Sequence, residues 1–227
     1  VRSLFEWRWE EAEALYRTAI AVNPGYSRAR HWYGVDFLSL LGRCQDALAE
    51  VRVAHDLDPL SMIIREGLGY VHMLCGDYPN ALAVYREVTD LDPGFYKGHG
   101  SLGRVLSLMG KYELAIEALE RSRELGGELP STLSALGGVL ARAGRRAQAL
   151  DVLQELEAMS QTRWVPANCF AILHLGLGDH AAALTYLEAA TDARELAVTA
   201  LRVHPLYDPL RADPRFERLL GRIGLLA

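Results

Sequence analysis

The chain has 227 residues, 50% of them hydrophobic, and its 29 acidic side chains outnumber its 24 lysines and arginines, so its formal net charge is −5. This balance argues against a surface that coats nucleic acid, which needs an excess of basic side chains, and the apolar content argues against disorder. Three cysteines are too few for a disulfide framework in a chain of this length, and no apolar run approaches the roughly 20 residues of a membrane-spanning helix.

A repeat of 34 residues runs through most of the chain. Its period is marked by five glycines, which are Gly42, Gly76, Gly110, Gly144 and Gly178. Five positions after each glycine comes an alanine, at Ala47, Ala81, Ala115, Ala149 and Ala183. Seven positions before each glycine the side chain is mostly very small, at Val35, Gly69, Gly103, Gly137 and Ala171. Linked positions that recur through five copies indicate a repeat architecture.

Each copy is predicted to form two helices. In the first full copy, residues 31–42 are apolar at helical spacing, and residues 43–59 form a second amphipathic run. A glycine such as Gly42 ends the first helix because it adopts a left-handed conformation without a Cβ penalty. A proline such as Pro59 or Pro93 ends the second helix because it lacks the N–H that the helix needs.

The small side chains of the repeat have a predicted packing role. Gly69 and Gly103 lie on first helices, and Ala81 and Ala115 lie on the second helices of the same copies. Small residues that face each other allow two helices to approach closely. We therefore expect Gly69 to lie opposite Ala81 and Gly103 to lie opposite Ala115.

The repeat resembles the tetratricopeptide repeat (TPR) family. One copy carries the matching residues Leu68, Gly69, His72, Gly76, Tyr78, Ala81, Tyr85 and Pro93. The resemblance implies an all-α fold, an α-solenoid or superhelix of stacked helix-turn-helix repeats. Five copies are expected at residues 26–60, 61–94, 95–128, 129–162 and 163–194, after a partial copy at residues 1–25 that supplies only a second helix.

Residues 195–227 lack the repeat spacing and are expected to form a C-terminal helical cap. The pattern predicts a helix over residues 195–203, a short turn after Pro205, and a last helix capped by Asp213. The end of a solenoid exposes an apolar face. Four apolar side chains are candidates to cover it, namely Leu219, Leu220, Ile223 and Leu225.

The opening WRW, the HWYG of the first full copy and the closing HPLYDPLRADPRF resemble the C-terminal TPR modules of larger bacterial regulatory proteins. This resemblance implies a cytoplasmic fragment of a regulator. The first residue is Val1 rather than methionine, which also indicates an excised or processed piece.

Residue patterns that carry chemistry are weak in this chain. Residues 98–103 match the dinucleotide pattern G-x-G-x-x-G, but a helix end and a turn precede them instead of a strand. His72 and Cys75 lie on one helix face, without two further metal ligands at a recognisable spacing. We therefore predict no catalytic residues, no cofactor and no metal, and a protein that is not an enzyme.

The first helices of stacked pairs line the concave side of such a solenoid. By repeat phase, the predicted groove residues are Trp32, Asp36, Glu66, Tyr70, Met73, Lys97, Arg104, Ser134, Asn168 and Ile172. Aromatic side chains and arginine dominate the energetics of many interfaces. The acidic groups Asp36 and Glu66 would repel the carboxylate of a chaperone tail, which argues against that ligand.

The sequence therefore predicts a non-catalytic module that binds a partner protein or peptide on its concave surface within a larger regulatory protein. The expected partners include neither nucleic acid nor membrane. The alternative is a module for self-association, as a homodimer, or for docking against an upstream effector domain of its own chain. An apolar N-terminal end would mediate such a dimer.

Overall fold

The computed structural model describes residue 4 and residues 6–226, and every regular element in this part of the chain is helical. The α-helices are α2 (Trp9–Val22), α3 (Ser27–Tyr33), α4 (Cys44–Leu57), α5 (Met62–Leu74), α6 (Tyr78–Leu91), α7 (Tyr96–Leu108), α8 (Tyr112–Gly126), α9 (Pro130–Arg142), α10 (Arg146–Ser160), α11 (Ala167–Leu177), α12 (His180–Asp192) and α13 (Pro214–Arg222). The π-helical turn η1 (Gly34–Leu38) continues α3, and η2 (Leu196–Ala200) and η3 (Pro205–Leu210) are 3-10 helices. The predicted all-α class is confirmed.

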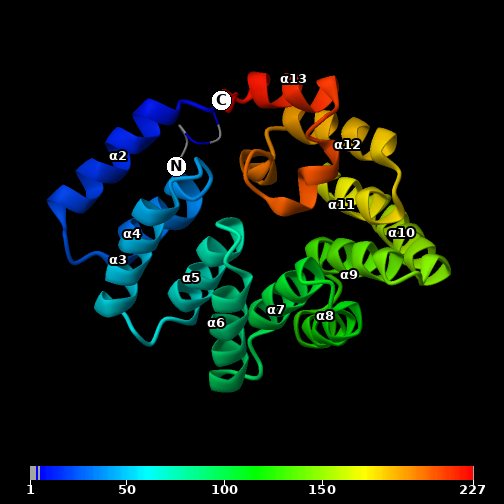
Figure 1. Cartoon of the computed structure of the whole chain (residues 1–227), viewed down its shortest axis with the longest axis horizontal. Coiled ribbons are helices and arrows are strands. Elements are labelled where there is room, and N and C mark those ends of the chain that lie inside the picture. Colours follow the sequence, from blue (N-terminus) through cyan, green and yellow to red (C-terminus); the bar gives the residue numbers. More distant parts are fainter. Residues whose placement is uncertain (1–3, 5, 227) are drawn as a thin grey trace.

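The helices from α3 to α12 stack as consecutive pairs. Each first helix packs on the second helix of its own pair, and α6 and α8 also pack on the first helix of the following pair. The stack curves so strongly that α13 comes to lie near the start of α2, and the chain forms a nearly closed ring (Figure 1). The predicted solenoid of stacked helix pairs is confirmed.

The repeat glycines end the first helices in the predicted way. Gly42, Gly76, Gly110, Gly144 and Gly178 all have a positive φ, between 71° and 80°. This left-handed conformation is strained for residues that carry a Cβ, and it lets the chain reverse within a few residues. One glycine in each copy thus occupies the sharp turn between the two helices of a pair.

Close helix contacts also depend on glycine, although the side chains opposite differ from the prediction. A Cβ atom on Gly69 would lie 2.6 Å from Cε1 of Tyr85, and one on Gly103 would lie 2.6 Å from Cγ of Leu119. Tyr85 and Leu119 are fully buried. The glycines therefore make room for large side chains of the second helices rather than only for Ala81 and Ala115, because the large side chains fill the space between the helices.

The two ends of the described chain contact each other. The indole N–H of Trp9 donates a hydrogen bond to the carbonyl oxygen of Ile223 at 2.8 Å, across 214 positions of sequence. The guanidinium of Arg194 lies 5.0 Å from the ring centroid of Trp7. Trp7, Trp9 and Leu41 pack against the apolar cluster of the C-terminal segment. These contacts hold the ring closed.

The C-terminal segment differs in part from its predicted structure. The expected helix over residues 195–203 is replaced by the short 3-10 helix η2, and a second 3-10 helix, η3, follows. The cap of the last helix is as predicted, since the Asp213 carboxylate accepts a hydrogen bond from the backbone N–H of Arg215. Leu219, Ile223 and Leu225 are buried in a cluster with α12, whereas Leu220 is only partly buried.

The chain folds η2 and η3 back toward the inside of the ring, where they occupy part of the concave side (Figure 1). The short helices let the segment turn, and they bury Val198, Leu201, Tyr207 and Leu210 against the last repeat. The concave surface is therefore built from the repeats and from this C-terminal segment together.

Candidate functional site

The concave surface is built from positions that recur with the repeat. Trp32, Glu66, Gly100, Ser134 and Asn168 occupy one such position on successive first helices, and Asp36, Tyr70, Arg104, Gly138 and Ile172 occupy the position one turn further on. A Cβ atom at Gly100 would lie 3.1 Å from Oγ of Ser122, and one at Gly138 would lie 3.2 Å from the carbonyl oxygen of Ile172, so glycine permits close packing at these two places. Successive repeats thus place different side chains at equivalent positions along the concave surface.

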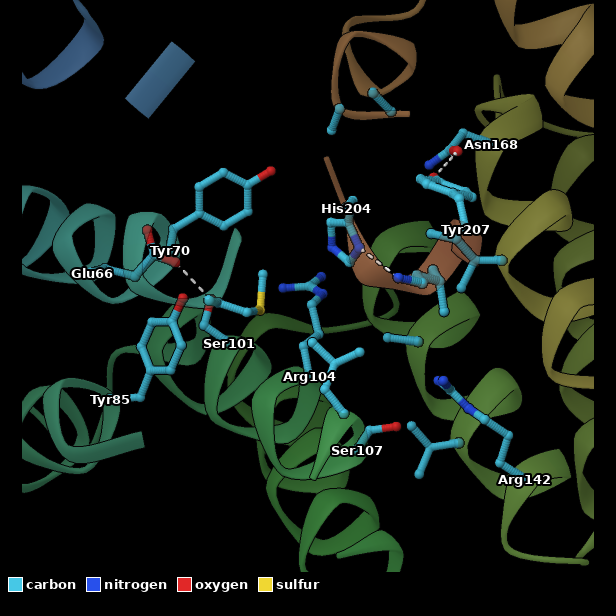
Figure 2. A pocket seen from close by; sticks show the side chains of 18 of the residues that line it. Glu66, Tyr70, Tyr85, Ser101, Arg104, Ser107, Arg142, Asn168, His204 and Tyr207 are labelled. Atoms are coloured by element: carbon cyan, nitrogen blue, oxygen red, sulfur yellow. Dashed lines mark hydrogen bonds between the residues drawn. The ribbon is translucent and has the colours of Figure 1, made fainter. Parts of the chain in front are cut away.

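A cavity of about 390 Å³, the central cavity, lies on this face. Helices α5, α7, α9 and α11 form one side of it, with residues such as Glu66, Arg104, Arg142 and Asn168. His204 and Tyr207 of the C-terminal segment form the other side (Figure 2). Most of the remaining lining is apolar and comes from Met73, Leu108, Ala135, Val139, Ile172 and Leu206.

A second hollow of about 220 Å³, the outer hollow, adjoins the central cavity. Both are lined by Glu66, Ser101 and Arg104. The outer hollow reaches the exposed side chains of Lys97 on α7 and Ser131 on α9. The two spaces therefore lie side by side on the concave surface.

The structure places the ten predicted groove residues in three settings. Six of them line the central cavity, namely Glu66, Tyr70, Met73, Arg104, Asn168 and Ile172. Lys97 lines only the outer hollow. The remaining three lie outside both spaces: Trp32 is exposed, Asp36 is half-buried, and Ser134 is fully buried, with its hydroxyl donating to the carbonyl of Ser131.

The acidic side of the cavity is formed by Glu66, with Asp36 close behind it. The Ser101 hydroxyl donates a hydrogen bond to the Glu66 carboxylate at 2.6 Å. Burial raises the pKa of Glu66, against the opposing effects of Ser101 and Arg104. Burial, with the nearby charge of Glu66, raises the pKa of Asp36 to about 6. These carboxyl groups therefore retain protons more readily than exposed ones.

The basic side of the cavity is formed by Arg104 and Arg142. The Nε–H of Arg142 donates to the carbonyl of Gly138 at 3.2 Å, and burial lowers the pKa of this guanidinium. Burial, together with Arg104 and Arg142, lowers the pKa of His204 to about 4. Nδ1 of His204 accepts a hydrogen bond from the backbone N–H of Leu206. A neutral imidazole with a donor at Nε2 thus faces two cations.

Two buried polar contacts fasten the C-terminal segment to α11. The carboxylate of Glu195 accepts hydrogen bonds from the backbone N–H groups of Ala167 and Asn168, at 2.7 and 3.1 Å. The Tyr207 hydroxyl donates to Oδ1 of Asn168 at 2.7 Å. A carboxylate is favourable at a helix N-terminus, where backbone N–H groups lack partners. Asn168 therefore links the C-terminal segment to α11 at the wall of the cavity.

The motifs that were considered for chemistry have structural positions. Residues 98–103 lie inside α7, so they form no glycine-rich loop. His72 lies 3.0 Å from the Asp77 carboxylate, and Cys75 is joined to Cys44 by a disulfide bond. Among the described residues, no group of three or more histidine, cysteine or acidic side chains is placed to hold a metal.

Sequence reasoning missed two features of this region. The first is the part that the C-terminal segment plays in the cavity, since His204 and Tyr207 lie outside the repeat and have no repeat phase. The second is the Cys44–Cys75 disulfide, whose Cα atoms lie 5.8 Å apart. Its signal was available, because Cys44 begins a second helix and Cys75 ends the first helix of the next copy, and stacked copies bring such ends together.

Comparisons with known proteins agree with the repeat architecture. Tetratricopeptide repeat models match residues 41–94, 96–125 and 130–155. No curated protein matches the chain. No helix within the described part of the chain has the length and apolar character needed to cross a membrane.

Solved structures share the fold. PilW, a widely conserved type IV pilus biogenesis factor, has a TM-score of 0.63 at 17% identity, over 89% of this chain and 93% of its own. A thermophilic TPR protein of Thermus thermophilus has a TM-score of 0.60 at 21% identity, over 88% of this chain and 100% of its own. A chain of the APC/C hetero-tetramer Cut9–Hcn1 has a TM-score of 0.67 at 16% identity, over 97% of this chain and 44% of its own.

Three features of the chain support its assignment to the family. The glycine and alanine spacing recurs along the chain, the helices form stacked pairs that turn at those glycines, and tetratricopeptide repeat models match three stretches of the sequence. The chain is a tetratricopeptide repeat protein.

Proposed function

We propose that this chain is a non-catalytic protein-interaction module that binds a segment of a partner along its concave surface, as part of a larger regulatory protein. The family is typically an interaction scaffold, which supports the general class. The observation that carries the finer proposal is that the outer hollow and the central cavity share Glu66, Ser101 and Arg104 in their linings. A partner segment lying on α5, α7 and α9 would meet both acidic and basic side chains.

The exposed rim of this surface supplies the first contacts in our proposal. Trp32 on α3 is 39% exposed, and Lys97 on α7 is also exposed. A solvent-accessible tryptophan contributes a large apolar area to an interface. A lysine at the edge of an interface favours an acidic segment and raises the rate of association. We therefore expect a partner segment with an apolar anchor and nearby acidic residues.

The proposal is tested with the combined variant Trp32→Ala, Lys97→Glu and a partner identified for the intact chain. The matched control is Trp164→Ala, Lys111→Glu, which changes the same residue types at exposed positions that are not among the predicted groove residues. We expect the first variant to weaken binding at least about tenfold in calorimetric titration and the control to leave affinity unchanged. Equal affinity for both variants would refute binding at this rim.

Self-association is the second proposal that the sequence raises. Its expected interface was an apolar N-terminal end, but Trp7, Trp9 and Leu41 pack on the C-terminal cluster of the same chain. This packing argues against dimerisation through that end. Light scattering over a range of concentrations tests the point, because a dimer that forms through another surface would show a mass that rises with concentration.

A further inference from the structure

The central cavity contains polar groups that the interaction proposal does not use. Arg142 and Ser107 line this cavity but not the outer hollow. Ser107 is buried, at 5% exposure, and its hydroxyl forms no hydrogen bond among the described residues. Buried polar groups are normally satisfied, so the Ser107 hydroxyl needs an explanation.

The two arginines of the cavity have donors to spare. Arg142 has one hydrogen bond, from Nε–H to the carbonyl of Gly138, and Arg104 has a long contact of 3.5 Å to the carbonyl of Ser131. The ion pairs of the described residues are made by other arginines. A guanidinium has five N–H donors in a planar fork that suits carboxylate and phosphate groups. Most donors of these arginines therefore remain for another acceptor.

These donors all belong to the lining of the central cavity. Figure 2 shows Arg104 and Arg142 on either side of Ser107, with His204 across from them on the C-terminal segment. Burial, and then the positive charges of Arg104 and Arg142, lower the pKa of His204. The imidazole accepts at Nδ1 from the backbone of Leu206, so its Nε2–H is a further donor. Such a set of donors favours an anion.

The rest of the cavity favours an apolar body. Leu108, Val139, Ile172 and Leu206 line the space around the donors. Its volume of about 390 Å³ falls within the range typical of small-ligand sites. A folded polypeptide segment is larger than this space, whereas a small aromatic or aliphatic acid fits it. The walls come from five repeats, including Val35 of the first full copy, and from the C-terminal segment, so the cavity exists only in the folded ring.

We propose that the central cavity is a binding site for a small organic anion, whose head group is held by Arg104, Arg142, Ser107 and His204 and whose apolar body lies against Val139 and Ile172. The head group is a carboxylate or a phosphate, since both offer acceptors that match the guanidinium fork. The carboxylate of Glu66 is influenced by the charge of Arg104 and disfavours a second negative charge in the part of the cavity that it lines. The site therefore selects molecules with one anionic end.

A consequence of this site is that the ligand bridges the repeats and the C-terminal segment. Arg104 and Arg142 belong to α7 and α9, and His204 belongs to the segment before η3. A molecule that contacts all three stabilises the packing of the segment on the concave surface, because ligand binding favours the state that contains the site. Through this contact, the bound anion would influence how the concave surface is presented to a protein partner.

The site is tested by isothermal titration calorimetry with phenylacetate, 3-phenylpropanoate and phenyl phosphate, each against the intact chain. The neutral amide phenylacetamide has the shape of the first probe without its charge. We expect at least one anion to bind with a Kd of about 1 mM or lower and the amide to bind at least about tenfold more weakly. A comparison of the affinities of the two carboxylates and of phenyl phosphate shows which head group is preferred.

Variants of residues that line only the central cavity locate the binding. We expect Arg142→Gln to weaken anion binding at least about tenfold and Ser107→Ala to weaken it about threefold. The matched control Arg146→Gln, at an exposed position on α10, leaves affinity unchanged. Circular dichroism verifies the fold of each variant, and Ser107→Ala keeps the test decisive if Arg142→Gln does not fold.

The assignment is overturned if no anion binds the intact chain at about 10 mM, or if Arg142→Gln and Ser107→Ala both bind as tightly as the original. It is also overturned if the amide binds as well as the anion. None of these results bears on the rim, because the rim variant changes Trp32 and Lys97, which do not line the central cavity. Failure of one proposal is thus distinguishable from failure of the other.

Discussion

Trp9 and Ile223 are joined by a hydrogen bond of 2.8 Å from the indole N–H to the backbone carbonyl, and this contact links the first described helix to the end of the last one. The side chain of Trp9 also packs against Phe37, with ring centroids 6.2 Å apart. Trp9 therefore contacts both the start of the solenoid and its C-terminal segment. It is a defined point at which the closure of the ring can be tested.

We predict that Trp9→Phe lowers the free energy of unfolding by about 1–2 kcal/mol, because the aromatic packing is largely kept while the hydrogen bond to Ile223 is lost. The measurement is equilibrium unfolding in urea. Trp164→Phe is the matched control, since Trp164 is 73% exposed, and it should change the free energy by less than about 0.5 kcal/mol. Identical stability of the two variants would contradict a stabilising contact between the ends.

The carboxylate of Glu195 provides a second test, at the base of the C-terminal segment. Glu195→Gln removes the negative charge from the N-terminus of α11 and leaves one acceptor in place of two, so we expect a loss of about 1–2 kcal/mol. Hydrogen exchange should become faster in residues 196–210, which this contact fastens. The exposed residue Glu217 on α13 supplies the control Glu217→Gln, and unchanged exchange in Glu195→Gln would show that other contacts hold the segment.

Asp36 gives a prediction about pH. Its pKa is raised to about 6, chiefly by burial and then by Glu66, whereas the unfolded chain has a value near 3.9. Between these values the folded state binds more protons, so this group lowers the free energy of unfolding as the pH rises from about 4 to about 6. Above about pH 6 the penalty is constant, and below about pH 4 it is absent.

Asp36→Asn removes that penalty and should stabilise the protein by about 1–2 kcal/mol at pH 7, since the half-buried carboxyl keeps part of its hydration. The gain should disappear below about pH 4. Urea unfolding at several pH values measures it, with Asp56→Asn on the exposed face of α4 as the control. A gain that persists at low pH would mean that the carboxyl charge is not its source.

The disulfide between Cys44 and Cys75 predicts the thiol chemistry of the chain. Under non-reducing conditions, the unfolded protein should release one reactive thiol, that of Cys169. In the folded protein Cys169 should be unreactive, because burial raises its pKa to about 11. Reduction should lower the free energy of unfolding by about 3–4 kcal/mol, as expected for the loop that this bond closes.

Titration with a thiol reagent, with and without denaturant, measures these outcomes. Three thiols in the unfolded, non-reduced protein would show that Cys44 and Cys75 are not joined.

The cross-link also bears on the compartment in which such a chain folds. Disulfides persist mainly in oxidising compartments, whereas the resemblance to regulatory modules led us to expect a cytoplasmic location.

The repeat was predictable because its determinants are local and recur. Gly76 and Gly110 mark the ends of first helices through their own backbone conformation, and each copy repeats the same signal. The same repeat phase predicted which side chains face the concave side, among them Glu66, Tyr70 and Arg104. Their common position on the concave side depends on the regularity of the stack and on little else.

The C-terminal segment was not predictable in the same way, because no copy elsewhere in the chain shows its structure. Residues 195–203 have helical composition, but tertiary contacts replace the helix with the short η2. Glu195 binds the N-terminus of α11 through space, and Tyr207 reaches Asn168 across 39 positions of sequence. Such contacts depend on the curvature of the whole stack, which a local pattern does not specify.

Closure by Trp9 and Ile223 changes how the molecule should lose its structure. In an open array, terminal units fray first, and each unit depends only on its neighbours. In a closed ring no unit is terminal, so the loss of any one unit removes contacts from both of its neighbours. The protein should therefore unfold in a single cooperative transition, and truncation at either terminus should replace that transition with gradual, less cooperative unfolding.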